Sequence, residues 1–173
     1  MARAIRPTGV EHMLGDEELI VSKTDLKGRI TYANDVFIRM AGYPARELIG
    51  APHSLIRHPD MPRCVFKLLW DTIAAGQEIF AYVVNLAADG SHYWVFAHVS
   101  PTFDGHGNIT GYHSSRRKPD RAPIERVKPI YALLREEEAR HANAKDGMRA
   151  GHDLLTGYLR QQGVGYDELV LSL

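Results

Sequence analysis

The segment 52–62, Pro-His-Ser-Leu-Ile-Arg-His-Pro-Asp-Met-Pro, concentrates side chains that could bind a ligand. Its histidines His53 and His58, its arginine Arg57 and its aspartate Asp60 can donate or accept hydrogen bonds or carry charge. Three prolines within these eleven residues fix the backbone and remove donors, so a regular helix is not expected. Polar side chains on a short, stiff loop are typical of a binding site. A solvated surface loop is the alternative that composition leaves open.

Arg57 has two roles open to it. Its guanidinium suits a phosphate group, or it could form a salt bridge with Asp60 that only braces the loop. His53 or His58 could instead ligate the iron of a haem. The other histidines are scattered without i, i+4 pairing, which does not indicate a zinc site. The single cysteine, Cys64, excludes an intramolecular disulfide and a cysteine-rich metal site.

Length and composition exclude several classes of protein. The 173 residues, 45% of them apolar, suffice for one domain with a core and a helical extension. The 21 basic and 21 acidic residues balance, so no net field attracts nucleic acid. Residues 1–15 lack the apolar run of a signal peptide, and no stretch of about eighteen apolar residues occurs. We therefore expect a cytoplasmic protein without direct membrane insertion.

The motifs of common enzymes are also missing. The sequence has no glycine-rich phosphate loop, no nucleophile elbow and no HExxH arrangement. We expect no enzymatic activity and no catalytic residues.

Turn residues and hydrophobic periodicity place the segment 52–62 between two groups of strands. Strands are expected at 18–24, 29–33, 78–86, 92–101 and 109–116. Helices are expected at 35–41, 45–49 and 63–75. Asn34 is placed to cap the first helix, and Gly28 favours a hairpin between the first two strands. This order predicts an α+β fold, with an antiparallel sheet and helices in the middle of the chain.

Beyond residue 118 the pattern becomes helical. Apolar residues recur at roughly heptad spacing from Ile124 to Leu134, and Pro129 is expected to kink this helix or delay its start. The charged run 135–140 is expected to be solvated. A second helix is expected at 144–161, and the apolar tail 166–173 is expected to dock on the rest of the protein.

The order of these elements resembles a PAS sensory domain. The motifs that carry the resemblance are Thr31 to Phe37 (TYANDVF), Gly42-Tyr43, Asp89 to Val95 (DGSHYWV) and Gly111-Tyr112. Pro52-His53 together with Ile56 to Pro62 (IRHPDMP) resembles the signature of the aerotaxis-receptor, or energy-taxis, branch of PAS domains. The resemblance covers approximately Leu19 to Leu134.

The resemblance implies a PAS fold, a five-stranded antiparallel sheet with helices on one face, followed by a C-terminal helical extension. The chain then divides into an N-terminal cap (1–17), a PAS domain (18–118) and an extension (119–173) for dimerisation or partner docking. Members of this branch bind FAD non-covalently and report its redox state to chemotaxis signalling. We expect a stand-alone PAS sensor, a homodimer through its N-terminal or C-terminal helices, with a chemoreceptor-like or other signalling partner. Haem b, or a ligand-free interaction module, are the alternatives.

The expected cofactor-binding residues follow from the same resemblance. They are Asn34, His53, Arg57, His58, Asp60, Phe66, Phe80, Asn85 and Trp94. Asn85 faces the pocket in most PAS domains, and its amide suits the carbonyl and imide edge of a flavin, or else bonds to backbone. Phe80 could form the aromatic wall of the pocket. Trp94 could stack on the ring, but packing on the outer face of the sheet is favoured. Asn34 is a helix cap first and a ligand contact second.

Overall fold

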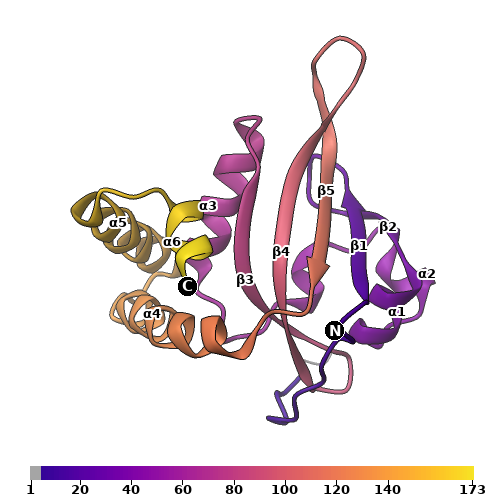
Figure 1. The fold of residues 1–173 in the computed structure, drawn as a ribbon, viewed down its shortest axis with the longest axis horizontal. Coiled ribbons are helices and arrows are strands. Elements are labelled where there is room, and N and C mark those ends of the chain that lie inside the picture. The colour runs from indigo at the N-terminus through magenta and orange to yellow at the C-terminus, as the bar shows by residue number, and fades with distance from the viewer. Residues whose placement is uncertain (1–4) are drawn as a thin grey trace.

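The computed structural model describes residues 5–173 and is built around a five-stranded antiparallel sheet. The strands are β1 (Leu19–Thr24), β2 (Ile30–Ala33), β3 (Ile79–Leu86), β4 (His92–Phe103) and β5 (Ile109–Arg117). Their order across the sheet is β2-β1-β5-β4-β3 (Figure 1). The first and last strands are neighbours, with Leu19 opposite Arg117. This arrangement confirms the expected sheet.

Helices connect one edge of the sheet to the other. They are α1 (Asp35–Ala41), α2 (Ala45–Leu48) and α3 (Arg63–Ala74), with a single 3-10 turn, η1 (His53–Ile56), before α3. Asn34 caps α1, because its side chain accepts a hydrogen bond from the Phe37 amide. The segment 52–62 contains no regular helix beyond that turn, as its prolines predict.

One part of the core lies between α1–α3 and one face of the sheet, here called the inner face. Side chains alternate along each strand, so Val83, Asn85 and Ala97 face inward while their neighbours face outward. Buried Val65, Leu69 and Ile73 of α3 pack against this face from above. The inner face and α3 therefore enclose the space in which a ligand could sit.

Three further helices form what we call the C-terminal arm, residues 121–173. They are α4 (Arg121–Ala139), α5 (Ala144–Gln162) and α6 (Tyr166–Ser172), and they lie beside α3 and the β3 edge of the sheet (Figure 1). The Tyr131 hydroxyl of α4 donates to the backbone carbonyl of Tyr82, and Asp167 of α6 accepts from the Phe80 amide at 2.9 Å. The tail therefore docks on the domain, as expected.

Pro129 does not delay the start of α4. The helix begins at Arg121 and continues through Pro129 to Ala139. The proline removes one backbone donor, but Ile124, Val127 and Tyr131 are buried, and this packing offsets the lost hydrogen bond.

The prediction that the run 135–140 is solvated is wrong for Glu138. This side chain is only 4% exposed, and its carboxylate accepts from the amides of Arg63 at 3.1 Å and Cys64 at 2.8 Å. Pro62, the N-cap of α3, has no side-chain acceptor for the first amides of the helix. Glu138 supplies that acceptor from α4, which explains its burial.

The described part of the N-terminal cap, residues 5–17, forms no helix. It runs beside the turn between β3 and β4, where the amides of Thr8 and His12 donate to the carbonyls of Gly90 and His92. Dimerisation through an N-terminal helix is therefore not available to residues 5–17, and the first four residues of the expected cap lie outside the described part. Within residues 5–173, no helix combines the length and apolar character needed to span a membrane.

Candidate ligand-binding site

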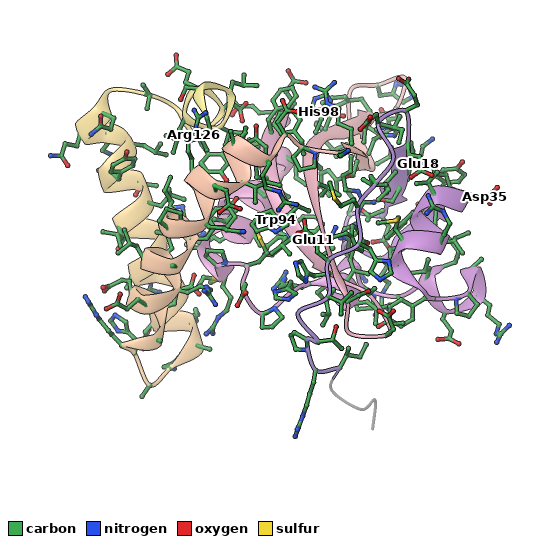
Figure 2. All side chains as sticks on the ribbon, turned by 60° about the horizontal axis from the view of Figure 1, so that its bottom comes forward. Glu11, Glu18, Asp35, Trp94, His98 and Arg126 are labelled. Atoms are coloured by element: carbon green, nitrogen blue, oxygen red, sulfur yellow. The ribbon has the colours of Figure 1, made fainter. Side chains whose placement is uncertain are left out.

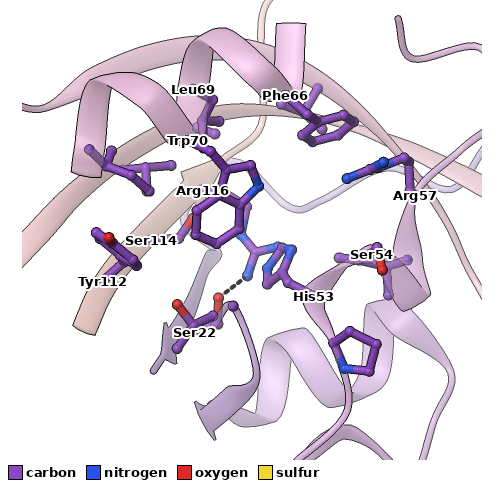
Figure 3. A pocket seen from close by; sticks show the side chains of 18 of the residues that line it. Ser22, His53, Ser54, Arg57, Phe66, Leu69, Trp70, Tyr112, Ser114 and Arg116 are labelled. Atoms are coloured by element: carbon purple, nitrogen blue, oxygen red, sulfur yellow. Dashed lines mark hydrogen bonds between the residues drawn. The ribbon is translucent and has the colours of Figure 1, made fainter. Parts of the chain in front are cut away.

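A cavity of about 230 Å³ lies between the inner face of the sheet and α3 (Figure 3). Its upper wall is apolar and comes from α3: Phe66, Leu69, Trp70 and Ile73. Its floor is more polar and comes from the strands: Ser22, Thr24, Val83, Asn85, Ala97, Val99, Tyr112, Ser114 and Arg116. His53 and Arg57 close one end. One wall thus offers an apolar surface to a flat ligand, and the other offers hydrogen-bond donors.

Arg116 is the charged group of the floor. It lies in β5 opposite Ile20 of β1 and Ala97 of β4, and it is only 2% exposed. One of its nitrogens, Nη2, donates to Ser22 Oγ at 2.6 Å, and the guanidinium carbon lies 4.5 Å from the centre of the Phe37 ring. Its Nε and Nη1 have no hydrogen-bond partner. Burial lowers the pKa of Arg116 to about 10, so the side chain remains cationic near neutral pH.

Arg57 lies at the end of the cavity and does not pair with Asp60. Its guanidinium carbon lies 4.1 Å from the centre of the Phe66 ring, and its Nε has no partner. Its backbone forms a one-residue antiparallel bridge with Asn85. Asp60 instead accepts from Arg135 Nη1 of α4 at 2.6 Å. The alternative in which an Arg57–Asp60 salt bridge braces the loop is therefore wrong, because the turn before α3 directs Asp60 toward α4.

His53 presents an unpaired nitrogen to the same space. Its ring lies 6.1 Å from that of Phe37, and its enclosed Nε2 has no hydrogen-bond partner. Burial, followed by the charges of Arg116 and Arg57, lowers the pKa of His53 to about 3. The imidazole is therefore neutral near pH 7 and offers one donor and one acceptor.

Asn85 belongs to a group of five cavity-lining side chains with unpaired polar atoms; the others are Thr24, His53, Arg57 and Arg116. Asn85 is 3% exposed, lines the floor, and its Nδ2 has no partner. Buried polar atoms are normally hydrogen-bonded, so their convergence from His53, Arg57, Asn85 and Arg116 on one cavity indicates a ligand with several acceptors. Among residues 5–173, no aspartate or glutamate lines this cavity, which is therefore electropositive.

A second, open groove of about 1,090 Å³ lies on the other side of Arg57, between the segment 57–63 and α4. Its charged side chains are three arginines and three glutamates: Arg57, Arg63, Arg135, Glu47, Glu136 and Glu138. His58 also lines it; its Nδ1 accepts from the Asp60 amide at 3.0 Å, and burial lowers its pKa. Arg57 is the residue that lines both spaces.

The cavity brings together only part of the expected site. His53, Arg57, Phe66 and Asn85 line it. His58 lines the outer groove, and both His58 and Asp60 line a neighbouring hollow beside Trp94. Asn34 caps α1 and also bonds the backbone of β1, donating to the Leu19 carbonyl.

Phe80 and Trp94 lie on the outer face of the sheet, away from the cavity. Trp94 is labelled in Figure 2. It packs parallel to Tyr131 of α4, with 6.4 Å between ring centres, in the packing role favoured from the sequence. Phe80 stacks on His98 with 4.4 Å between ring centres.

Arg116 is the important residue that sequence reasoning missed. In the sequence it belongs to the run Arg116-Arg117-Lys118, which suggests a solvated end of a strand. Only the alternation Tyr112, Ser114, Arg116 could have indicated a shared inward face.

The residues present fit a flavin ring. The apolar wall from α3 can cover its faces, and the unpaired donors can meet its carbonyl and nitrogen edge. The enclosed volume is below the ~300–1,000 Å³ of pockets that hold a whole drug-sized ligand, so a dinucleotide would have to extend beyond the cavity. Cys64 is buried beside Glu138 and Gly151 and does not line the cavity. Residues 5–173 contain no cluster of three or more His, Cys, Asp or Glu side chains suited to a metal ion.

Comparison with known proteins identifies the family of this chain. The profile of the PAS fold family matches residues 30–116. The aerotaxis receptor of Escherichia coli (strain K12) is 40% identical over 121 residues, which are 70% of this chain and 24% of that protein. A nitrogen fixation regulatory protein of Klebsiella pneumoniae is 29% identical over 61% of this chain and 21% of its own length. The chain thus spans less than a quarter of the length of these relatives.

Solved structures agree on the fold. The light-state structure of the blue-light photoreceptor Aureochrome1 LOV superposes with a TM-score of 0.55 at 22% identity, covering 68% of this chain and 91% of that one. The match to the family profile, residues 30–116, covers α3 and the floor residues of β3, β4 and β5, but not Ser22 and Thr24 of β1. The chain therefore belongs to the PAS fold family.

Proposed function

We propose that this chain is a cytoplasmic PAS sensor that binds FAD non-covalently and relays its redox state to a chemotaxis-type signalling partner. The observation that carries the proposal is the convergence of unpaired polar atoms from His53, Arg57, Asn85 and Arg116 on one electropositive cavity. The 40% identity to a protein named aerotaxis receptor supports the same assignment. In this role the chain senses and carries out no catalytic step.

A flavin matches the chemistry of the cavity wall by wall. When bound, a flavin supplies reversible electron transfer, and the protein has only to bind, orient and tune it. Phe66 and Trp70 provide aromatic surface above the ring position. Asn85 offers a donor and an acceptor together, which suits alternating carbonyl and imide groups.

The arginine between the cavity and the outer groove favours FAD over a flavin without a pyrophosphate. Arg57 lines both the enclosed cavity and the outer groove, and Arg63 and Arg135 line that groove as well. Guanidinium groups bind phosphate oxygens in bidentate fashion. Among residues 5–173, Arg57 has no carboxylate partner, whereas Arg63 and Arg135 pair with Glu138 and Asp60. A pyrophosphate would therefore find its free cation at Arg57.

The position of the thiol supports non-covalent attachment. Cys64, the single cysteine of the chain, lies at the start of α3 with its sulfur 3.2 Å from the Cβ position of Gly151 in α5. Burial and the neighbouring Glu138 raise its pKa far above the usual range, which keeps the thiol protonated and unreactive.

The relay to a partner would run through the segment 57–63. Arg57 contacts the ligand space, Asp60 pairs with Arg135, and the amide of Arg63 donates to Glu138. Both latter partners belong to α4, so a change of charge in the cavity can alter how the C-terminal arm packs. Exposed apolar side chains lie along that arm and could form a homodimer or receptor interface: Leu133, Leu154, Tyr158 and Leu171.

The absorbance spectrum of the purified full chain tests the proposal. We expect flavin bands that bleach on reduction, and chromatography of the cofactor released by denaturation should identify FAD. Arg57→Ala should weaken FAD more than riboflavin, because it removes a phosphate partner; Arg46→Ala, in exposed α2, is the matched control. Protein that stays colourless after incubation with FAD would overturn the proposal.

Haem is the second candidate, because the free Nε2 of His53 could serve as an axial ligand. The same spectrum separates the two, since haem gives a Soret band that shifts on binding carbon monoxide. A ligand-free module fits less well, because it would leave the buried polar atoms of the cavity-lining side chains unpaired.

A further inference from the structure

Arg116 carries its charge where the protein supplies no counterion. The described salt bridges include none to this side chain, and no carboxylate of residues 5–173 lines the cavity. Its protein partners are the hydroxyl of Ser22 and the face of the Phe37 ring. In Figure 3 the guanidinium lies between Trp70 and His53, with its bond to Ser22 drawn. Two of its donor nitrogens are left for a ligand.

Such a charge is costly in the empty protein. A buried cation without a paired anion loses its hydration, and a neutral hydroxyl and an aromatic face replace only part of it. A ligand that brings negative charge to Nε and Nη1 replaces the hydration that Ser22 and Phe37 do not. A ligand that is neutral in one state and anionic in another is therefore bound more tightly in its anionic state.

We propose that Arg116 is the group that makes this site sensitive to redox state, by donating to the edge of the ligand that becomes anionic on reduction. The proposal rests on the function proposed above, that the ligand is a flavin. Arg116 stabilises the negative charge left when a one-electron donor adds an electron and no proton is taken up. Each tenfold preference of the site for the reduced anion raises the one-electron midpoint potential by about 59 mV.

The proposal predicts effects of opposite sign in the empty and the loaded protein. Arg116→Met has nearly the same length but no charge, so it should raise the melting temperature of the ligand-free protein. In the loaded protein it should weaken flavin binding on the order of 10- to 100-fold, as expected for lost charge-assisted hydrogen bonds. The midpoint potential should become more negative.

Arg117→Met is the matched control. It removes the same charge from the next residue of β5, which is exposed and stacks on Phe96 of the outer face, with 5.3 Å between the guanidinium carbon and the ring centre. It should leave the melting temperature, the affinity and the potential close to those of the wild type. Arg116→Lys keeps the charge, so its midpoint potential should lie closer to that of the wild type than to that of Arg116→Met.

The experiment combines reductive titration of the loaded full chain with a reference dye, flavin affinity by fluorescence quenching, and melting of the ligand-free protein. The expected result is a more negative potential and weaker binding for Arg116→Met, together with higher ligand-free stability. If Arg116→Met does not fold, Arg116→Gln takes its place, with the same predicted shift in potential.

The failures of the two proposals are distinguishable. A wild-type protein that binds no flavin overturns the proposed function, and this inference with it. A wild-type protein that binds flavin, with Arg116→Met or Arg116→Gln at unchanged potential and affinity, overturns the inference and leaves the proposed function standing.

Discussion

Asp60 and Arg135 lie 75 residues apart in sequence, and the Nη1 of Arg135 donates to Asp60 Oδ1 at 2.6 Å. This bond joins the segment beside the cavity to α4 of the C-terminal arm. The side chains are 59% and 39% exposed, respectively. Ion pairs with this exposure contribute little to stability, about 0–1 kcal/mol. A bond of this strength can break and form again as the charge in the cavity changes.

Removing that bond should loosen α4 while leaving the fold intact. We expect Arg135→Gln to lower the free energy of unfolding by less than about 1 kcal/mol, because water replaces the lost partner. Amide hydrogen exchange should rise in the second half of α4 and in the segment 57–63, with little change in the central strands. Mass spectrometry of peptic fragments measures this.

A double-mutant cycle with Asp60→Asn shows whether the two side chains act on each other. The effects of Arg135→Gln and Asp60→Asn on exchange should not add, since either change alone breaks the bond. Arg140→Gln, which breaks exposed pairs with Glu136 and Glu137 within the same region, is the control. Additive effects on exchange would contradict the link.

Glu138 should matter far more than its acidic neighbours. Glu138→Ala removes the acceptor for the first amides of α3 and leaves them buried without a partner. We expect a loss of about 1–3 kcal/mol in the free energy of unfolding, measured by urea denaturation. Glu136→Ala, an exposed change two residues earlier, should cost less than about 0.5 kcal/mol. Equal losses for both variants would refute the capping role.

Two glycines of α5 should respond in opposite ways to alanine. A Cβ at Gly147 would lie 2.3 Å from the Glu138 carbonyl oxygen, whereas a Cβ at Gly157 would have no neighbour within 4 Å. Gly147→Ala should therefore separate α5 from α4 and destabilise the arm. Gly157→Ala should stabilise the protein by about 0.4–1 kcal/mol, because alanine favours the helix. Thermal melts of both variants check the sign; a neutral Gly147→Ala would show that the arm packs differently.

The sequence was sufficient for features that depend on neighbouring residues. Asn34 as a helix cap, Gly28 in the first hairpin and the broken helix at 52–62 follow from local preferences of backbone and side chain. The expectation that Asn85 faces a pocket comes from the resemblance to PAS domains, and the structure places Asn85 in the cavity floor.

Arg116 and Glu138 could not be placed in this way. Both belong to charged runs that suggest solvated surface, Arg116-Arg117-Lys118 and Arg135 to Arg140. Their burial depends on the register of β5 between β1 and β4, and on the crossing of α4 over the start of α3. Neither long-range contact has a periodic signature.

Acid should destabilise the ligand-free protein partly through His53. Its pKa is about 3 in the folded protein, against about 6.5 for an ordinary histidine, because burial and the charges of Arg116 and Arg57 disfavour the imidazolium. Between these two values the unfolded chain binds a proton that the native protein does not. The contribution of neutral His53 to the free energy of unfolding is therefore fully present above about pH 6.5. It is lost as the pH drops toward 3, by up to about 1.4 kcal/mol per pH unit.

The variant His53→Phe removes this proton and keeps a ring of similar shape against Phe37. We expect its free energy of unfolding to fall less steeply between pH 6.5 and 4 than that of the wild type. The two slopes should differ by up to the value that corresponds to one bound proton. Some slope should remain, because burial also lowers the pKa of His58 and of His113. Urea denaturation at several pH values gives both slopes, and Gly157→Ala, which changes no titratable group, should retain the wild-type slope. Identical slopes for His53→Phe and the wild type would mean that His53 is protonated in the folded protein, and so that the cavity is wetter and less positive than its lining residues imply.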